Sequence, residues 1–271
     1  MSDLLTLKKR LQNIHAVHEI TDAMHIISTI AIGNAQKFLD YRRKVQSLHD
    51  RLFITSNACI RQSKENENWL IIFFSEKGFC GNFNPQLLPL LNKNKNIENI
   101  IVIGTRGRTY AERLGIKTEY FFEAAKRQPK ETIIDKVYDL LKEKGFPQNI
   151  KVIFNKYNNV FIQTPKIINF FPDFQNVYKD MNSITDIEGD YLDKFILERY
   201  VQAKLIYFFA QNYTGEIASK LLMMKNATDS AKKLHTDLSK QVYKARQMKI
   251  TQELSEVISA YKVLQLQRER R

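Results

Sequence analysis

The apolar positions in the last quarter of the chain recur every three or four residues. From 216 to 260 there is no Pro or Gly, and one seam carries the apolar and small residues Ile217, Leu221, Met224, Thr228, Ala231, His235, Leu238, Val242 and Ala245. This heptad-like pattern predicts a long helix over about 191–268 that packs along its length against another helix. Near residue 245 the stripe shifts phase, and it resumes at Ile250, Leu254, Val257, Tyr261 and Leu264.

The first 63 residues show the same periodicity. The pattern predicts a helix over about 3–63 with a stripe formed by Leu7, Leu11, Ile14, His18, Thr21, Ser28, Ile32, Ala35 and Leu39. Neither helix can bury its seam alone, so we expect the two chain ends to pair antiparallel. Alanines on the seam would let the helices approach closely, although helix propensity explains them equally well: Ala16, Ala23, Ala31, Ala35, Ala227, Ala231 and Ala245.

Between the two helices, short apolar runs alternate with amphipathic segments. Buried strands are predicted at 69–74, 100–103 and 117–122, helices at 85–91, 106–114 and 132–144, and a hairpin at 150–156 with 160–165. This alternation indicates a small, mostly parallel α/β sheet. We therefore expect an N-terminal coiled-coil helix (1–64), an inserted α/β, Rossmann-like domain (65–190, with a loop over 172–190) and a C-terminal coiled-coil helix (191–271).

Several single residues carry local predictions. Asn84 is a plausible N-cap for the helix that follows it, and Gly78 and Gly81 suit turn positions with positive φ. Gly215 could mark a bend in the long C-terminal helix. The pair Gly104 and Gly107 follows a strand and could cradle a phosphate, but the full dinucleotide fingerprint and the P-loop motif are missing, which favours a tight turn.

The net charge of +13 is concentrated at the two ends of the chain. Residues 1–64 carry a balance of +5 and residues 193–271 one of +7, against +1 between them. A basic rod is either simply well solvated or faces an acidic surface such as nucleic acid, anionic lipid or an acidic protein. No apolar run reaches the ~18 residues of a membrane span, and no targeting signal precedes the helical pattern, so we expect a cytoplasmic protein.

Catalytic and cofactor-binding chemistry has little support in the sequence. Cys59 and Cys80 lack the spacing of a zinc site and are expected to be reduced packing thiols. His15 and His18 share a helix face, but no third ligand adjoins them in the sequence. We expect no cofactor, no metal and no catalytic residue on this chain.

Three groups of motifs resemble the gamma subunit of F-type ATP synthases. MKNATD at 224–229, KARQ at 244–247 and ITQE at 250–253 are similar to that family's C-terminal signature. ITDAM at 20–24 is similar to its opening helix, and SEKGFCGNFN at 75–84 to its first strand-to-helix turn. The chain departs from the family at His25, where Lys is usual, and at Asn82, where a second Gly is usual.

The resemblance implies an antiparallel coiled coil that stands inside a ring of alternating alpha and beta subunits. It also implies contact with the epsilon subunit and the membrane c-ring, at the cytoplasmic face of a bacterial inner membrane. The shaft would couple proton-driven rotation to ATP synthesis at the beta-subunit sites. By motif match, the residues that contact beta would be Met24, Arg246, Gln247, Thr251, Gln252 and Glu253.

Two other functions remain open on the residues alone. A basic coiled coil that binds nucleic acid would account for the charge and the helices, but not for the α/β insert, and no aromatic-studded basic patch is present. A nucleotide-binding α/β enzyme with helical arms would account for the insert, but lacks its motifs. Steep salt dependence of DNA binding would favour the former, and tight ATP or NAD binding the latter.

Overall fold

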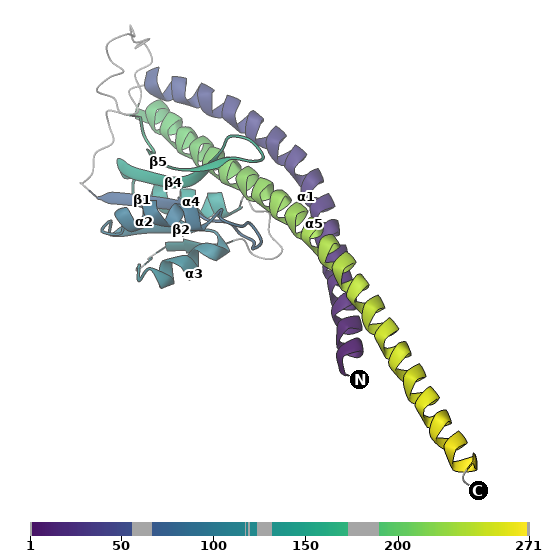
Figure 1. Cartoon of the computed structure of the whole chain (residues 1–271). Helices are drawn as coiled ribbons and strands as arrows, with labels where there is room; N and C mark the ends of the chain where they lie inside the picture. Colours follow the sequence, from purple (N-terminus) through teal and green to yellow (C-terminus); the bar gives the residue numbers. More distant parts are fainter. Residues whose placement is uncertain are drawn as a thin grey trace. The chain divides into compact units, whose positions relative to one another are not determined.

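The computed structural model describes residues 2–55, 67–116, 118, 120–123, 132–172 and 190–269. Two long helices, α1 (Ser2–Thr55) and α5 (Asp190–Glu269), enclose an α/β segment in the sequence, as predicted (Figure 1). The predicted end of the first helix, at residue 63, lies outside the described residues. Two compact units are present, one formed by residues 1–26 with 224–271 and the other by residues 27–223.

The sheet of the larger unit has five strands in the order β3-β2-β1-β4-β5 (Figure 1). The strands are β1 (Asn68–Phe73), β2 (Asn99–Ile103), β3 (Tyr120–Phe122), β4 (Asn149–Tyr157) and β5 (Gln163–Asn169). The first four are parallel and β5 is antiparallel to β4, which confirms a mostly parallel sheet with a terminal hairpin. The central strand β1 is buried along almost its whole length, so its run of apolar side chains packs on both faces.

The hairpin differs from the prediction in its second strand, which begins at Gln163 and not at residue 160. The side-chain oxygen of Asn159 accepts hydrogen bonds from the backbone N–H groups of Phe161 and Ile162, both at 2.9 Å. These bonds hold residues 159–162 in a turn, because an Asn side chain can replace the strand partner of a nearby backbone group.

The helices cover the two faces of the sheet. On one face, α4 (Thr132–Glu143) and the first part of α5 pack on the side chains of Trp69, Ile71 and Phe73. On the other face, Leu70 and Ile72 pack with a short 3-10 helix (Pro85–Leu87), α2 (Leu88–Lys93) and α3 (Thr105–Arg113). The alternation of β1 side chains between two apolar clusters follows from the two-residue period of a strand.

Within the larger unit, α1 and α5 pack side by side in opposite directions (Figure 1). The rings of Phe53 and Tyr200 stack with centroids 4.0 Å apart, and further along the pair Thr214 Oγ1 donates to the Ala35 carbonyl at 3.1 Å. Residue numbers rise on one helix as they fall on the other. The predicted stripe of α1 is confirmed here, since Ile32 and Leu39 are buried against α5.

The close approach of α5 to the sheet explains Gly215. A Cβ at this position would lie 2.9 Å from Phe83 Cε2 and 3.4 Å from Gln163 Cγ. Because Gly215 has no Cβ, the turn that carries Phe83 and the hairpin strand that carries Gln163 can pack closely against α5. The helix is continuous through this residue, since α5 runs from Asp190 to Glu269.

In the smaller unit, the imidazole rings of His15 on α1 and His235 on α5 lie 5.6 Å apart. The predicted seam is confirmed, with Met224 and Ala231 buried. The placement of Ala16 and Ala23 on the seam was wrong, because both are exposed. Ala16 follows Ile14 by two residues, and Ala23 follows Thr21 by two residues. Two residues correspond to a rotation of about 200° around the helix axis, so both alanines lie on the face opposite the stripe.

The second stripe of α5 is present but exposed. Ile250, Leu254, Val257 and Tyr261 are between 54% and 66% exposed. Because His15 lies beside His235 in the antiparallel arrangement, positions beyond about 248 have no α1 residue opposite them in the described part of the chain.

Candidate functional site

Five of the six residues predicted to contact a partner lie close together on α5. Arg246, Gln247, Thr251, Gln252 and Glu253 are all exposed. Met24 is half-buried on α1. With His15 opposite His235, Met24 falls opposite about residue 226, which is roughly 30 Å along the helix from Arg246 at a rise of about 1.5 Å per residue. The structure therefore does not bring Met24 together with the other five.

The polar side chains near Arg246 are engaged along the helix. Thr251 Oγ1 donates to the Gln247 carbonyl at 3.0 Å, and Lys249 Nζ lies 3.4 Å from Glu253 Oε1. Among the described residues, the guanidinium of Arg246 has neither a hydrogen bond nor an ion pair. It is an exposed cation with its donors available, which suits contact with carboxylates or carbonyl groups of another chain.

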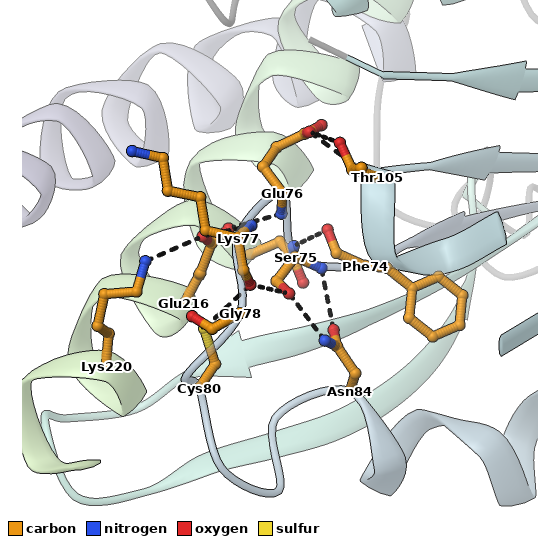
Figure 2. A network of polar contacts seen from close by, with 11 residues as sticks. Phe74, Ser75, Glu76, Lys77, Gly78, Cys80, Asn84, Thr105, Glu216 and Lys220 are labelled. Carbon is orange, nitrogen blue, oxygen red and sulfur yellow. Dashed lines mark hydrogen bonds and ion pairs between the residues drawn. The ribbon is translucent and has the colours of Figure 1, made fainter. Parts of the chain in front are cut away.

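A second polar site lies at the carboxyl end of β1, where α5 meets the turn after that strand (Figure 2). The carboxylate of Glu216, which is 3% exposed, accepts the backbone N–H of Glu76 at 3.1 Å and that of Lys77 at 3.2 Å. Lys220, one turn further along α5, places Nζ 3.8 Å from Glu216 Oε1. A buried charge is stable only when it is paired and hydrogen-bonded, and Glu216 has both kinds of partner.

Asn84 closes this turn from the other side, and it stands at the predicted N-cap position of the helix that follows. Its Oδ1 accepts the backbone N–H of Ser75 at 2.9 Å, and its Nδ2 donates to Ser75 Oγ at 2.7 Å. It makes no side-chain cap to the following helix. The amide turns toward the strand because the N–H of Ser75 is buried there and needs an acceptor (Figure 2).

The glycines after β2 serve close packing and not phosphate binding. A Cβ at Gly104, where φ is +105°, would lie 2.5 Å from the Phe74 carbonyl oxygen, and one at Gly107 would lie 2.4 Å from Val102 Cγ1. The first residue of α3, Thr105, donates both its hydroxyl (2.6 Å) and its backbone N–H (3.3 Å) to Glu76 Oε2. A carboxylate of the chain itself thus occupies the place where a helix start would bind an anion (Figure 2).

The expectation of positive φ holds for one of the two turn glycines. Gly81 has φ of +55°, whereas the other left-handed residue of this turn is Phe79, with φ of +63°. A Cβ at Gly78 would lie 2.6 Å from Arg106 Nη2, so this glycine makes room for an arginine. Phe79 is 72% exposed, in a conformation that bulky residues rarely adopt.

Two amide side chains of α5 complete the contact with the sheet. Asn212 Nδ2 donates to the Phe74 carbonyl at 3.1 Å, and Gln211 Oε1 accepts the backbone N–H of Tyr157 at 2.9 Å. They therefore bond the chain just beyond β1 and at the end of β4. In α/β sheets, ligands bind in the crevice outside the carboxyl ends of the strands. Here α5 fills this place with its own polar groups.

Three polar residues of this site were not predicted: Gln211, Asn212 and Glu216. The available signal was polar residues in a helical stretch that is otherwise apolar, 205–218, where a buried polar side chain needs a partner. Their partners lie 54 to 140 residues away in the chain, so only the fold identifies them.

Cys80 belongs to the same turn and is buried without a disulfide. Burial, together with the nearby charge of Glu216, raises the pKa of its thiol to about 11. Cys59 lies outside the described residues. Within the described ranges, no group of three or more His, Cys, Asp or Glu side chains is arranged to hold a metal ion, and no helix is long and apolar enough to cross a membrane.

Comparison with protein families gives one match that spans most of the chain. A family model described as ATP synthase matches residues 3–264. Among curated proteins, the ATP synthase gamma chain of Clostridium botulinum (strain Langeland) is 29% identical, over 94% of this chain and 96% of its own length. The ATP synthase gamma chain of Buchnera aphidicola is 26% identical, over 98% of this chain and all of its own.

Solved structures with a similar fold come from the same kind of assembly. A chain from the Euglena gracilis mitochondrial ATP synthase, in a structure described as OSCP/F1/c-ring, has a TM-score of 0.74 at 13% identity and covers 97% of this chain. A chain from the rotor of that enzyme has a TM-score of 0.69 at 12% identity and covers 92%. At these identities the likeness concerns the fold.

Proposed function

The chain belongs to the gamma-subunit family of F-type ATP synthases, and on this basis we propose that it is the central shaft of the rotor. It couples proton-driven rotation of the membrane ring to ATP synthesis at the beta-subunit sites. The family match over residues 3–264 is the observation that carries this conclusion. The chain is a non-catalytic subunit, since the catalytic sites of this enzyme lie on beta.

The finer structural proposal is that α1 and α5 form an antiparallel coiled coil. The stacked rings of Phe53 and Tyr200 in one unit and the adjacent rings of His15 and His235 in the other support it, as does the three-and-four spacing of the seams. We also propose that the chain is divided into two coiled-coil helices, at 1–64 and 191–271, and an α/β domain at 65–190.

The partners that we propose are the alpha and beta subunits around the shaft, the epsilon subunit and the membrane c-ring. The related structures come from assemblies whose descriptions include F1 and the c-ring, which supports this set. The bacterial relatives support a location at the cytoplasmic face of the inner membrane, where the chain is held through the complex. The comparisons give no support to the nucleic-acid-binding alternative.

The proposed contacts with beta are Arg246, Gln247, Thr251, Gln252 and Glu253, with Met24 at a separate point of the shaft. These five residues of α5 are exposed and therefore accessible to a partner, which supports the proposal. Ion pairs at such an exposed surface are worth only about 0–1 kcal/mol each and exchange easily. A basic shaft can therefore pass successive acidic loops without being trapped at one angle.

Purification of a tagged copy from its native membranes tests the rotor assignment. We expect alpha, beta and epsilon chains to copurify with ATPase activity. Recovery of nucleic acid, or of this chain alone, would reject the assignment.

Substitution of Arg246 by Ala tests the proposed contact. We expect the complex to assemble and to hydrolyse ATP, but to pump fewer protons per ATP, because the fork of donors to beta is lost. Lys240→Ala is the matched control, since it removes an exposed cation from the same helix outside the proposed contact. Wild-type coupling in an assembled Arg246→Ala complex would refute the role of Arg246.

A further inference from the structure

In the smaller unit, a histidine from each helix lies at the same level, His235 on the seam of α5 and His15 beside the seam of α1. His15 projects from α1 and His235 from α5, and their ring centroids lie 5.6 Å apart with the ring planes tilted by 58°. Sequence spacing had paired His15 only with His18, one turn along the same helix. The antiparallel packing supplies a different neighbour, which is 220 residues away in the chain.

The separation of these rings suits one shared metal ion. Zinc binds imidazole nitrogen at about 2.0–2.1 Å, so two rings that share a tetrahedral ion have centroids roughly 5–6 Å apart. The observed 5.6 Å falls in this range. The tilt keeps the rings from stacking face to face, so a small rotation about the side-chain bonds can aim a nitrogen of each ring at a common point.

A carboxylate also lies near the His15 ring. His15 Nδ1 lies 3.6 Å from Glu19 Oε1, one helical turn away. A carboxylate in this position favours the tautomer with its hydrogen on Nδ1 and leaves the lone pair of Nε2 available. Metal-binding histidines usually have such a partner, which also holds the ring in place.

We propose that His15 and His235 bind one divalent transition-metal ion, of the zinc, nickel or copper class, as a link between α1 and α5. Since no group of three metal-binding side chains exists within the described ranges, water completes the coordination. The His15 side chain is 58% exposed, so water and metal reach the site in the isolated chain. Such a site binds reversibly and makes the rigidity of the helix pair depend on available metal.

On the α5 side, Lys232 and Lys233 lie three and two residues before His235, and Lys232, one helical turn away, opposes metal binding. Glu19 offsets it on the α1 side. Copper is expected to bind more tightly than nickel or zinc, in the order that nitrogen ligands generally follow.

The test is titration of the full-length chain with zinc chloride and with copper chloride, followed by calorimetry. All variants carry Cys59→Ser, so that this thiol does not compete. We expect one ion per chain, and a loss of affinity of at least about tenfold in His15→Gln and in His235→Gln. His49→Gln is the matched control, because it removes a half-buried helical histidine from the larger unit and should leave binding unchanged.

A second measurement separates metal binding from folding. Thermal melting of the helical circular-dichroism signal should shift upward by a few degrees with zinc in the wild type and in His49→Gln, and not in the other two variants. Electron paramagnetic resonance of the copper form should show two equivalent nitrogen ligands. Unchanged zinc affinity in either His15→Gln or His235→Gln, with helicity retained, would overturn the proposal.

Discussion

Lys204 should make the stability of the larger unit rise with pH. This side chain is 12% exposed, lies over the ring of Tyr200, and donates a hydrogen bond to the Tyr200 hydroxyl. Its nearest acid is Asp50, with 3.7 Å between Lys204 Nζ and Asp50 Oδ1. Burial lowers the pKa of Lys204 to about 8, although Asp50 acts in the opposite direction.

The size of the effect follows from the pKa values in the two states. An unfolded lysine has a pKa of about 10.4, and each pKa unit corresponds to about 1.36 kcal/mol. Between about pH 8 and 10 the folded chain has lost this proton and the unfolded chain keeps it, so the free energy of unfolding rises with pH. The rise amounts to about 2–3 kcal/mol. Above about pH 10 the trend reverses, because burial raises the pKa of Tyr200 and unfolding then favours its ionisation.

The substitution Lys204→Met removes the amine that titrates but keeps most of the volume of the side chain. At neutral pH we expect this variant to be as stable as the wild type or more so, because burial disfavours the charged Lys204, while Asp50 is 41% exposed and remains solvated when its partner is removed. Asp50 keeps the hydrogen bond from Gln46 at 2.8 Å. The variant should lose the rise in stability between pH 8 and 10.

Urea unfolding at a series of pH values measures both expectations. Trp69 is the one tryptophan of the chain and is 1% exposed, so its fluorescence reports on the core of the larger unit. Lys136→Met is the control, because it removes an exposed lysine from α4. If Lys204→Met shows the same rise as the wild type, the reasoning from burial is wrong.

Two further predictions concern the turn after β1. Gly104→Ala should lower the free energy of unfolding by at least about 2 kcal/mol, because its Cβ would meet the Phe74 carbonyl at 2.5 Å and its φ of +105° is unfavourable for alanine; an unchanged urea midpoint, against Gly33→Ala as control, would contradict this. In a Cys59→Ser chain, Cys80 should react with iodoacetamide at least about 100-fold more slowly than free cysteine, whose pKa is about 8.5, because its own pKa is raised to about 11. Reaction at the rate of free cysteine would show that the thiol is accessible and ionised.

The seams of the long helices could be predicted because periodicity alone determines them. Buried positions such as Ile32 and Leu39 follow the three-and-four spacing over many turns, and each turn adds to the signal. Ala16 and Ala23 were misplaced because alanine is common on every face of a helix and carries little information on burial.

The polar site could not be predicted, because its bonds join distant parts of the chain. Asn84 occupies the predicted N-cap position, but its side-chain amide bonds Ser75, whose burial depends on the packed sheet. The partner of His15 was missed for a related reason. Both His15 and His235 are near predicted seams, but the register of an antiparallel pair depends on the whole contact between the helices.

The way α5 meets the sheet explains how an α/β fold can serve a mechanical role. In α/β folds, ligands bind in the crevice outside the carboxyl ends of the strands. Here three side chains of α5 bond backbone groups at the ends of β1 and β4: Asn212, Gln211 and Glu216. All three belong to the same continuous helix. Each such bond contributes about 1 kcal/mol, and more where the carboxylate is involved, while an unpaired buried group would cost about 1–3 kcal/mol. Moving the helix away from the sheet would break several of these bonds together, so the sheet is held firmly to the helix that we propose as the shaft.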